Sequence, residues 1–144
     1  MNNLLLDHLK KFEGCKLTAY QDQGGVWTIG YGCTGYGIVR GVRWQQERAD
    51  NELEKRANVV ALDAVKYSPI LKDQNESKRA AIASFIYNCG VDAYLKSGLK
   101  ISVDAGHWQE SAIQIKKWNH VHGVVNHGLE NRREAEACML TKDN

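Results

Sequence analysis

The chain has 144 residues, 43% of them hydrophobic and 25% charged, which is typical of one soluble globular domain. Nineteen lysines and arginines against 17 acidic residues give a formal net charge of +2, too small a bias to predict a nucleic-acid partner. The apolar segment from Met1 to Leu6 is far shorter than a signal peptide's apolar stretch or a membrane span, so we expect no stable membrane association.

The first third of the chain predicts a short helix, a small β-region and the start of a long helix. Residues 3–12 place apolar side chains on one side of a helix, and Gly14 is placed to end it, so Glu13 should lie at the helix end. Over residues 15–41, aromatic and branched residues alternate with seven glycines, which is typical of short antiparallel strands joined by tight turns. From about Trp44 the apolar residues recur at helical spacing.

The rest of the chain is predicted to be mostly helical. Asp73 and Glu76 have the spacing of a capping box, and residues 80–86 are almost all apolar, which predicts a buried helix ending near Gly90. We further expect short helical pieces over 91–105, a helix from Trp108 to Trp118, a loop from His120 to Gly128 and a last helix from Leu129 to Leu140.

The cysteines and histidines do not predict a metal site or a cofactor. The cysteines are widely spaced and form no C-x-x-C pair: Cys15, Cys33, Cys89 and Cys138. Four cysteines allow three disulfide pairings, and free thiols in a cytosolic chain are the simpler interpretation. Three histidines gather in one predicted loop without an acidic or cysteine partner nearby: His120, His122 and His127.

Glu13, Asp22 and Thr28 are the candidate catalytic residues. Cleavage of a glycosidic bond needs an acid that protonates the leaving oxygen, and an inverting enzyme also needs a base that activates water on the opposite face of the sugar. A hydroxyl such as that of Thr28 can hold this water in line. Taken singly, a glutamate at a helix end and an aspartate in a turn are more often surface capping groups.

The motifs around these three residues resemble the phage lysozyme (endolysin) family. The matching segments are Lys11-Phe-Glu-Gly, Ala19-Tyr-Gln-Asp22 and Gly25-Val-Trp-Thr28-Ile-Gly-Tyr-Gly32. Glu13, Asp22 and Thr28 match the family's motif of a glutamate, eight residues, an aspartate, five residues and a threonine. The resemblance continues through 81–90, 118–119 and 128–136, and so covers nearly the whole chain in the right order.

This resemblance implies a fold and an activity. The fold would be one α+β lysozyme domain over 1–144, with a β-lobe over roughly 15–42, a helical lobe over 1–14 and 43–144, and a cleft between them. The activity would be hydrolysis of the β-1,4 bond between N-acetylmuramic acid and N-acetylglucosamine in bacterial peptidoglycan, causing host lysis. We also expect a monomer that needs no cofactor, stays in the host cytoplasm until lysis and depends on a holin-type membrane permeabiliser.

The resemblance also implies that an arginine of the last helix lies near Glu13, and Arg132 is our candidate, with a solvated helix face as the alternative. Asn88 and Tyr31, which lie in matching segments, are candidate supporting or substrate-binding residues. A general acid must carry a proton at neutral pH, whereas an adjacent arginine favours the anion. Either the arginine engages Glu13 part of the time, or substrate binding desolvates the site.

The cysteines mark departures from the family pattern. Many relatives place a histidine after the Ile-Gly-x-Gly run, where this chain has Cys33, and we expect a structural role there. Some exported relatives carry a cysteine at the position of Cys15 and use disulfide exchange to stay inactive, but we expect a packing residue. A bridge between Cys89 and Cys138 is a further alternative, because both lie where helices of this fold pack.

Two other functions stay open. A peptidoglycan-binding module without catalysis would not need Glu13, Asp22 and Thr28 together. A lytic transglycosylase uses one glutamate and forms an anhydro sugar, whereas the pairing of an aspartate with a threonine favours water as the nucleophile and inversion at the anomeric carbon.

The histidine loop borders the cleft in this family and is expected to contact sugar. The tryptophans could stack on sugar rings or belong to the core: Trp27, Trp44, Trp108 and Trp118.

Overall fold

A computed structural model describes residues 3–143, so Met1 and Asn2 of the apolar N-terminal segment lie outside the described residues. The chain forms helix α1 (Asn3–Glu13), strands β1 (Lys16–Gln21) and β2 (Trp27–Gly30), helix α2 (Gln46–Tyr67), the short 3-10 helix η1 (Pro69–Asp73), helices α3 (Glu76–Cys89), α4 (Val91–Leu95), α5 (Gly98–Asp104) and α6 (Trp108–Lys116), strands β3 (His120–Val121) and β4 (Val124–Val125), and helix α7 (His127–Leu140). In that range no helix is long and apolar enough to cross a membrane.

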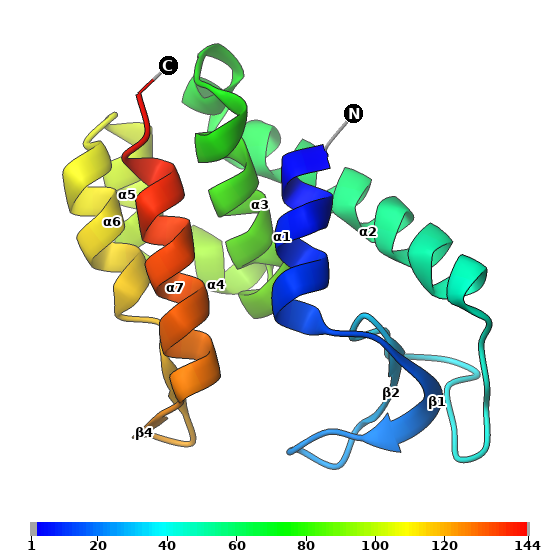
Figure 1. Cartoon of the computed structure of the whole chain (residues 1–144). Helices are drawn as coiled ribbons and strands as arrows, with labels where there is room; N and C mark the ends of the chain where they lie inside the picture. Colours follow the sequence, from blue (N-terminus) through cyan, green and yellow to red (C-terminus); the bar gives the residue numbers. More distant parts are fainter. Residues whose placement is uncertain (1–2, 144) are drawn as a thin grey trace.

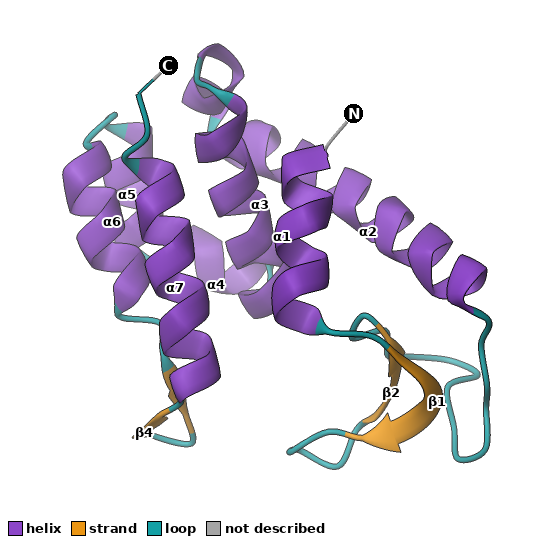
Figure 2. Ribbon diagram, viewed as in Figure 1, coloured by secondary structure: helices purple, strands orange, loops and turns teal. Residues whose placement is uncertain are grey.

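The α+β class is confirmed, since helices dominate and two small antiparallel sheets accompany them (Figure 2). Helix α1 ends at Glu13, as predicted, because Gly14 adopts a φ of +66° that a side chain disfavours. The chain then enters the hairpin of β1 and β2, in which Tyr20 lies opposite Thr28. Helix α2 leads from this β-region back to the other helices (Figure 1).

Helix α3 forms the centre of the helical core. Every residue from 80 to 86 is buried, which confirms the prediction drawn from its apolar sequence. It packs against α1, α2 and α7, which surround it in Figure 1. The ring of Phe85 is fully buried and meets the ring of Trp118 edge-on, with 5.2 Å between the ring centroids.

The predicted capping box before α3 is wrong. Asn75 caps the helix instead, because its side-chain oxygen accepts a hydrogen bond from the backbone N–H of Lys78 at 2.9 Å. Asp73 is the last residue of η1, so α3 starts two residues later than a capping box of Asp73 and Glu76 would require. Glu76 is the first helical residue, and its Oε1 atom accepts a hydrogen bond from the backbone N–H of Leu4 at 3.3 Å.

The predicted loop over His120–Gly128 is also wrong in part. Two-residue strands β3 and β4 pair there, and Val121 lies opposite Val124. The turn between them places His122 at a φ of 50° and Gly123 at 78°, as a tight type I′ hairpin turn requires. Helix α7 begins at His127, two residues earlier than predicted, because the side chain of Asn126 accepts a hydrogen bond from the N–H of Leu129.

Candidate active site

The carboxylate of Glu13 lies at the junction of α1 with the β-region. Its side chain is 15% exposed, so Glu13 is not fully enclosed by the protein. Gly32, in the turn after β2, lies directly against it: a Cβ atom placed on Gly32 would be 3.1 Å from Glu13 Oε1. The φ of this glycine is +83°, a conformation that disfavours any side chain. Glycine at this position therefore makes room for the carboxylate of Glu13.

Arg132 approaches Glu13 from α7. Its Nη1 atom donates a hydrogen bond to Glu13 Oε2, and its Nη2 atom donates to the hydroxyl and the carbonyl of Ser84, at 3.1 Å and 3.4 Å. The arginine is only 3% exposed, so its interpretation as part of a solvated helix face is wrong. The guanidinium is held on several sides and places a fixed positive charge beside Glu13.

Asp22 and Thr28 belong to the hairpin that follows Glu13. Asp22 Oδ1 accepts backbone hydrogen bonds from Gly24 at 2.8 Å and Val26 at 2.9 Å, so the turn fixes the carboxylate. Among the described residues, Oδ2 of Asp22 has no hydrogen-bond partner. Thr28 is buried, and its hydroxyl donates to the carbonyl of Val26 at 2.9 Å. Both candidates are therefore linked through Val26 within one turn.

Tyr20 is influenced by the charges of both candidate carboxylates, although its sequence pattern gave no functional signal. Burial raises the pKa of its hydroxyl, and the negative charges of Glu13 and Asp22 raise it further. Tyr20 also lies beside a candidate catalytic residue, since it pairs with Thr28 across the two strands of the hairpin. The alternation of side chains along β1 was the available signal, but it could not show that the charge of Glu13 would act on Tyr20.

The structure places the two supporting candidates differently. The hydroxyl of Tyr31 donates to Asp50 Oδ1 at 2.9 Å, and its backbone carbonyl accepts a hydrogen bond from the hydroxyl of Tyr87 at 2.6 Å. Burial and the bond to Asp50 raise the pKa of Tyr31 to about 12, so it is a neutral link between the β-region and helices α2 and α3. Asn88 is exposed at the end of α3 and, in the described part of the chain, forms no hydrogen bond with Glu13.

All four cysteines are free thiols in this structure. The alternative of a bridge between Cys89 and Cys138 is therefore not realised: Cys138 is exposed, and the Cys89 thiol accepts a hydrogen bond from Arg133 Nη1 at 3.2 Å. Cys15 is half-buried and its sulfur lies 3.8 Å from Gln46 Nε2, in keeping with a packing residue. Cys33 is buried within the loop that follows β2, where its backbone pairs with Ile29.

The tryptophans differ in their surroundings. Trp44 is buried, and the guanidinium of Arg48 lies over its ring, while Lys78 lies over the ring of Trp108. Trp118 packs on Phe85, and Trp27 is half-buried in β2. At least two of the four therefore serve packing. The three histidines of the β3–β4 region are exposed, and the described residues contain no group of three metal-ligating side chains.

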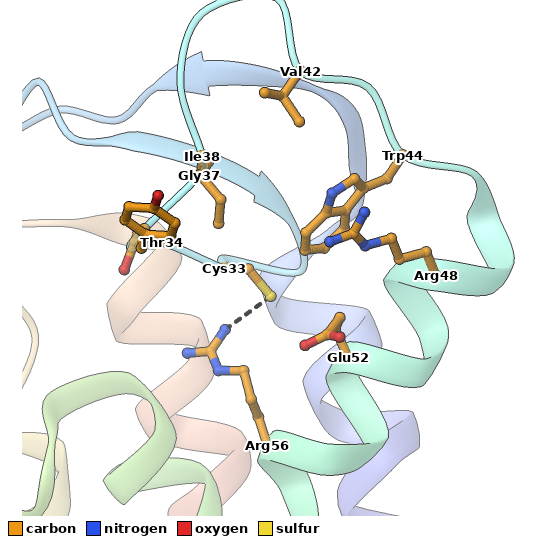
Figure 3. Close-up of a pocket in the computed structure, with 10 residues that line it drawn as sticks. Cys33, Thr34, Gly37, Ile38, Val42, Trp44, Arg48, Glu52 and Arg56 are labelled. Carbon is orange, nitrogen blue, oxygen red and sulfur yellow. Dashed lines mark hydrogen bonds between the residues drawn. The ribbon is translucent and has the colours of Figure 1, made fainter.

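A cavity of about 380 Å³ lies between α2 and the loop over 33–42 (Figure 3). Cys33, Glu52 and Arg56 face it, and Arg56 Nη1 donates to the sulfur of Cys33 at 3.4 Å. None of the three candidate catalytic residues lines this cavity. The guanidinium of Arg56 also stacks on the ring of Tyr87, 4.3 Å from its centroid, which ties α2 to α3 beside the cavity.

The chain is similar in sequence and in fold to phage lysozymes and endolysins. A family model described as phage lysozyme matches residues 10–136. The chain is 34% identical over 146 residues to an endolysin of Lactococcus phage c2, covering 95% of this chain and 58% of that protein. The endolysin from Escherichia coli O157:H7 phage FAHEc1 has a TM-score of 0.85 at 30% identity, covering 95% of this chain and 90% of that one. The muramidase domain of SpmX from Asticaccaulis excentricus has a TM-score of 0.83 at 27% identity, covering 97% and 96%.

Proposed function

The chain belongs to the phage lysozyme family, and we propose that it hydrolyses the β-1,4 bond between N-acetylmuramic acid and N-acetylglucosamine in bacterial peptidoglycan. The observation that carries this proposal is the partly exposed side chain of Glu13, whose carboxylate is held by a buried arginine beside the hairpin that carries Asp22 and Thr28. The structural likeness to a domain described as a muramidase supports the choice of bond. The chain spans 58% of the length of the phage c2 endolysin, so activities of that longer protein's remaining part are not included.

Each of the three residues has a defined part in the proposed reaction. Glu13 gives its proton to the leaving glycosidic oxygen as the bond from that oxygen to the anomeric carbon breaks. A water oxygen forms the new bond to the anomeric carbon, and Asp22 accepts the proton that this water releases. The hydroxyl of Thr28 already donates to the Val26 carbonyl, so it is left to accept a hydrogen bond from the same water. In the proposed reaction, this water is the one that Asp22 deprotonates.

Muropeptide analysis separates this proposal from its alternatives. We expect purified peptidoglycan treated with the protein to release fragments that end in a reducing N-acetylmuramic acid, as measured by mass spectrometry. A lytic transglycosylase would release anhydro sugars, each lighter by one water molecule. A binding module would co-sediment with the peptidoglycan and release no fragments. Either of these last two results would contradict the proposed hydrolysis.

We further propose that the reaction inverts the anomeric carbon. An inverting enzyme leaves room for water, with its two carboxyl groups about 6.5–9.5 Å apart, whereas a retaining enzyme holds them at about 5–5.5 Å. The backbone hydrogen bonds to Asp22 Oδ1 favour a fixed base over a group that must approach and attack the sugar. Proton NMR before mutarotation should therefore show the α-anomer as the first reducing product. An initial β-anomer, or a sugar ester trapped on Asp22, would show that the reaction retains configuration.

The biological setting follows from the relatives more than from the site. Their description as endolysins supports peptidoglycan as the partner and host lysis as the outcome. The monomeric state, the dependence on a holin-type permeabiliser and a cytoplasmic location until lysis stay predictions of the sequence.

A further inference from the structure

A buried cluster of charges lies behind Glu13, and its centre is Glu136 on α7. The side chain of Glu136 is fully buried. Its Oε2 atom accepts hydrogen bonds from Arg132 Nε at 3.3 Å, Arg133 Nη2 at 3.2 Å and the hydroxyl of Ser84. Arg133 Nε lies 2.7 Å from Glu136 Oε1, an ion pair without hydrogen-bond geometry. A single carboxylate therefore holds two buried arginines.

Arg132 is shared between two carboxylates. Its Nη1 atom faces Glu13 and its Nε atom faces Glu136. If Glu13 were the sole anionic partner, its protonation would leave a buried guanidinium without a counter-charge, which is strongly unfavourable. Because Glu136 stays bound to the other side of the same guanidinium, Arg132 keeps an anionic partner when Glu13 becomes neutral.

We propose that Glu136 is a positioning residue for the reaction. Its carboxylate binds Arg132 and offsets part of the positive charge that Arg132 presents to Glu13. Glu13 can therefore take up and hold the proton that it donates to the sugar. This inference rests on the proposed function of Glu13 as the general acid. It also resolves the conflict between a general acid and an adjacent arginine. The two arginines and Glu136 together present one net positive charge to Glu13, instead of two.

Three further titratable groups near the cluster leave this balance unchanged near neutral pH. Burial raises the pKa of Tyr20 on β1, and of Tyr87 and Cys89 on α3, so these three are neutral. His8 on α1 also faces the cluster: its Nε2 atom lies 3.4 Å from Glu136 Oε2, and the residue is buried. Asp22 contributes a further negative charge near Tyr20 and is unchanged in every variant used below.

The test is Glu136→Gln, measured as the pH profile of kcat/KM on peptidoglycan. The amide keeps the shape and removes the charge, so Arg132 and Arg133 present two positive charges and favour the anion of Glu13. We expect the alkaline limb of the profile to move down by about one pH unit, with about a tenfold loss of activity on that limb. Glu136→Asp keeps the charge, so its limb should stay at the wild-type pH even where its overall rate falls. A uniform loss at every pH in Glu136→Gln would contradict the proposal.

Arg133→Gln gives a second, opposite readout and keeps the test valid if Glu136→Gln does not fold. It removes one of the two positive charges that Glu136 balances, so the alkaline limb should move to higher pH. Repeating both substitutions with His8→Gln tests the imidazole, and the shifts should persist. An alkaline limb that stays in place in Arg133→Gln, or shifts that vanish with His8→Gln, would overturn the role given to Glu136.

Carbon NMR of the Glu13 carboxyl group, identified by its loss in Glu13→Gln, separates this inference from the proposed function. The pH midpoint of that signal should move in the same directions as the activity limbs. If the protein proves inactive on peptidoglycan, the proposed function fails but the midpoint still moves. If the protein is active and the midpoint does not move in either variant, the charge of Glu136 does not act on Glu13.

Discussion

Replacing Glu13 with glutamine is expected to abolish peptidoglycan hydrolysis and to leave the fold intact. The amide has nearly the shape of the carboxyl group but has no proton to give to the leaving oxygen, and general acid catalysis contributes about 10²–10⁴-fold to such rates. The amide oxygen can still accept the hydrogen bond from Arg132, so the buried guanidinium keeps a partner. The release of reducing sugar ends from purified peptidoglycan, followed over time, measures the loss.

Glu54→Gln is the matched control, because Glu54 is an exposed glutamate on α2, away from the candidate site. It should keep wild-type activity. Circular dichroism and the thermal midpoint of each variant show whether it is folded. A folded Glu13→Gln protein that retains more than about a tenth of the wild-type rate would remove Glu13 from the role of general acid.

Local rules were sufficient for the part of the site that lies within 20 residues of Glu13. A short amphipathic helix followed by glycine places Glu13 at a helix end, and a glycine-rich hairpin places Asp22 in a turn. Both features depend on residues that are near in the chain. The same reasoning gave the long helix after Trp44 and the buried helix α3, whose apolar residues set their own pattern.

Contacts between residues that are far apart in the sequence could not be predicted from these local rules. His8 and Glu136 are 128 positions apart and meet because α1 and α7 both pack on α3. Along α7, Arg132 and Glu136 have the ordinary spacing of an exposed helical ion pair, and the sequence does not show that both are buried. The missed cap at Asn75 has a local cause instead, since the neighbouring acidic pair Asp73 and Glu76 fitted the capping rule as well.

Replacing Gly32 with alanine is expected to reduce activity about 10- to 100-fold, because the new methyl group would crowd the acid itself. The Cβ atom would lie 3.1 Å from Glu13 Oε1, closer than ordinary contact, so the carboxylate must move or the turn must open. Gly37→Ala is the matched control: Gly37 has the same φ of +83°, but nothing lies within 4 Å of the added methyl group. Both variants share the cost of a left-handed alanine, about 1–2 kcal/mol of folding stability.

The difference between these two variants isolates the contact with Glu13 from backbone strain. Thermal unfolding should lower the midpoint of both proteins to a similar extent, while kcat on peptidoglycan falls mainly in Gly32→Ala. The loss should appear in kcat more than in KM, because the displaced group acts in the chemical step and not in holding the sugar chain. Equal activity in the two variants would mean that Glu13 tolerates the displacement, and that Gly32 serves the turn alone.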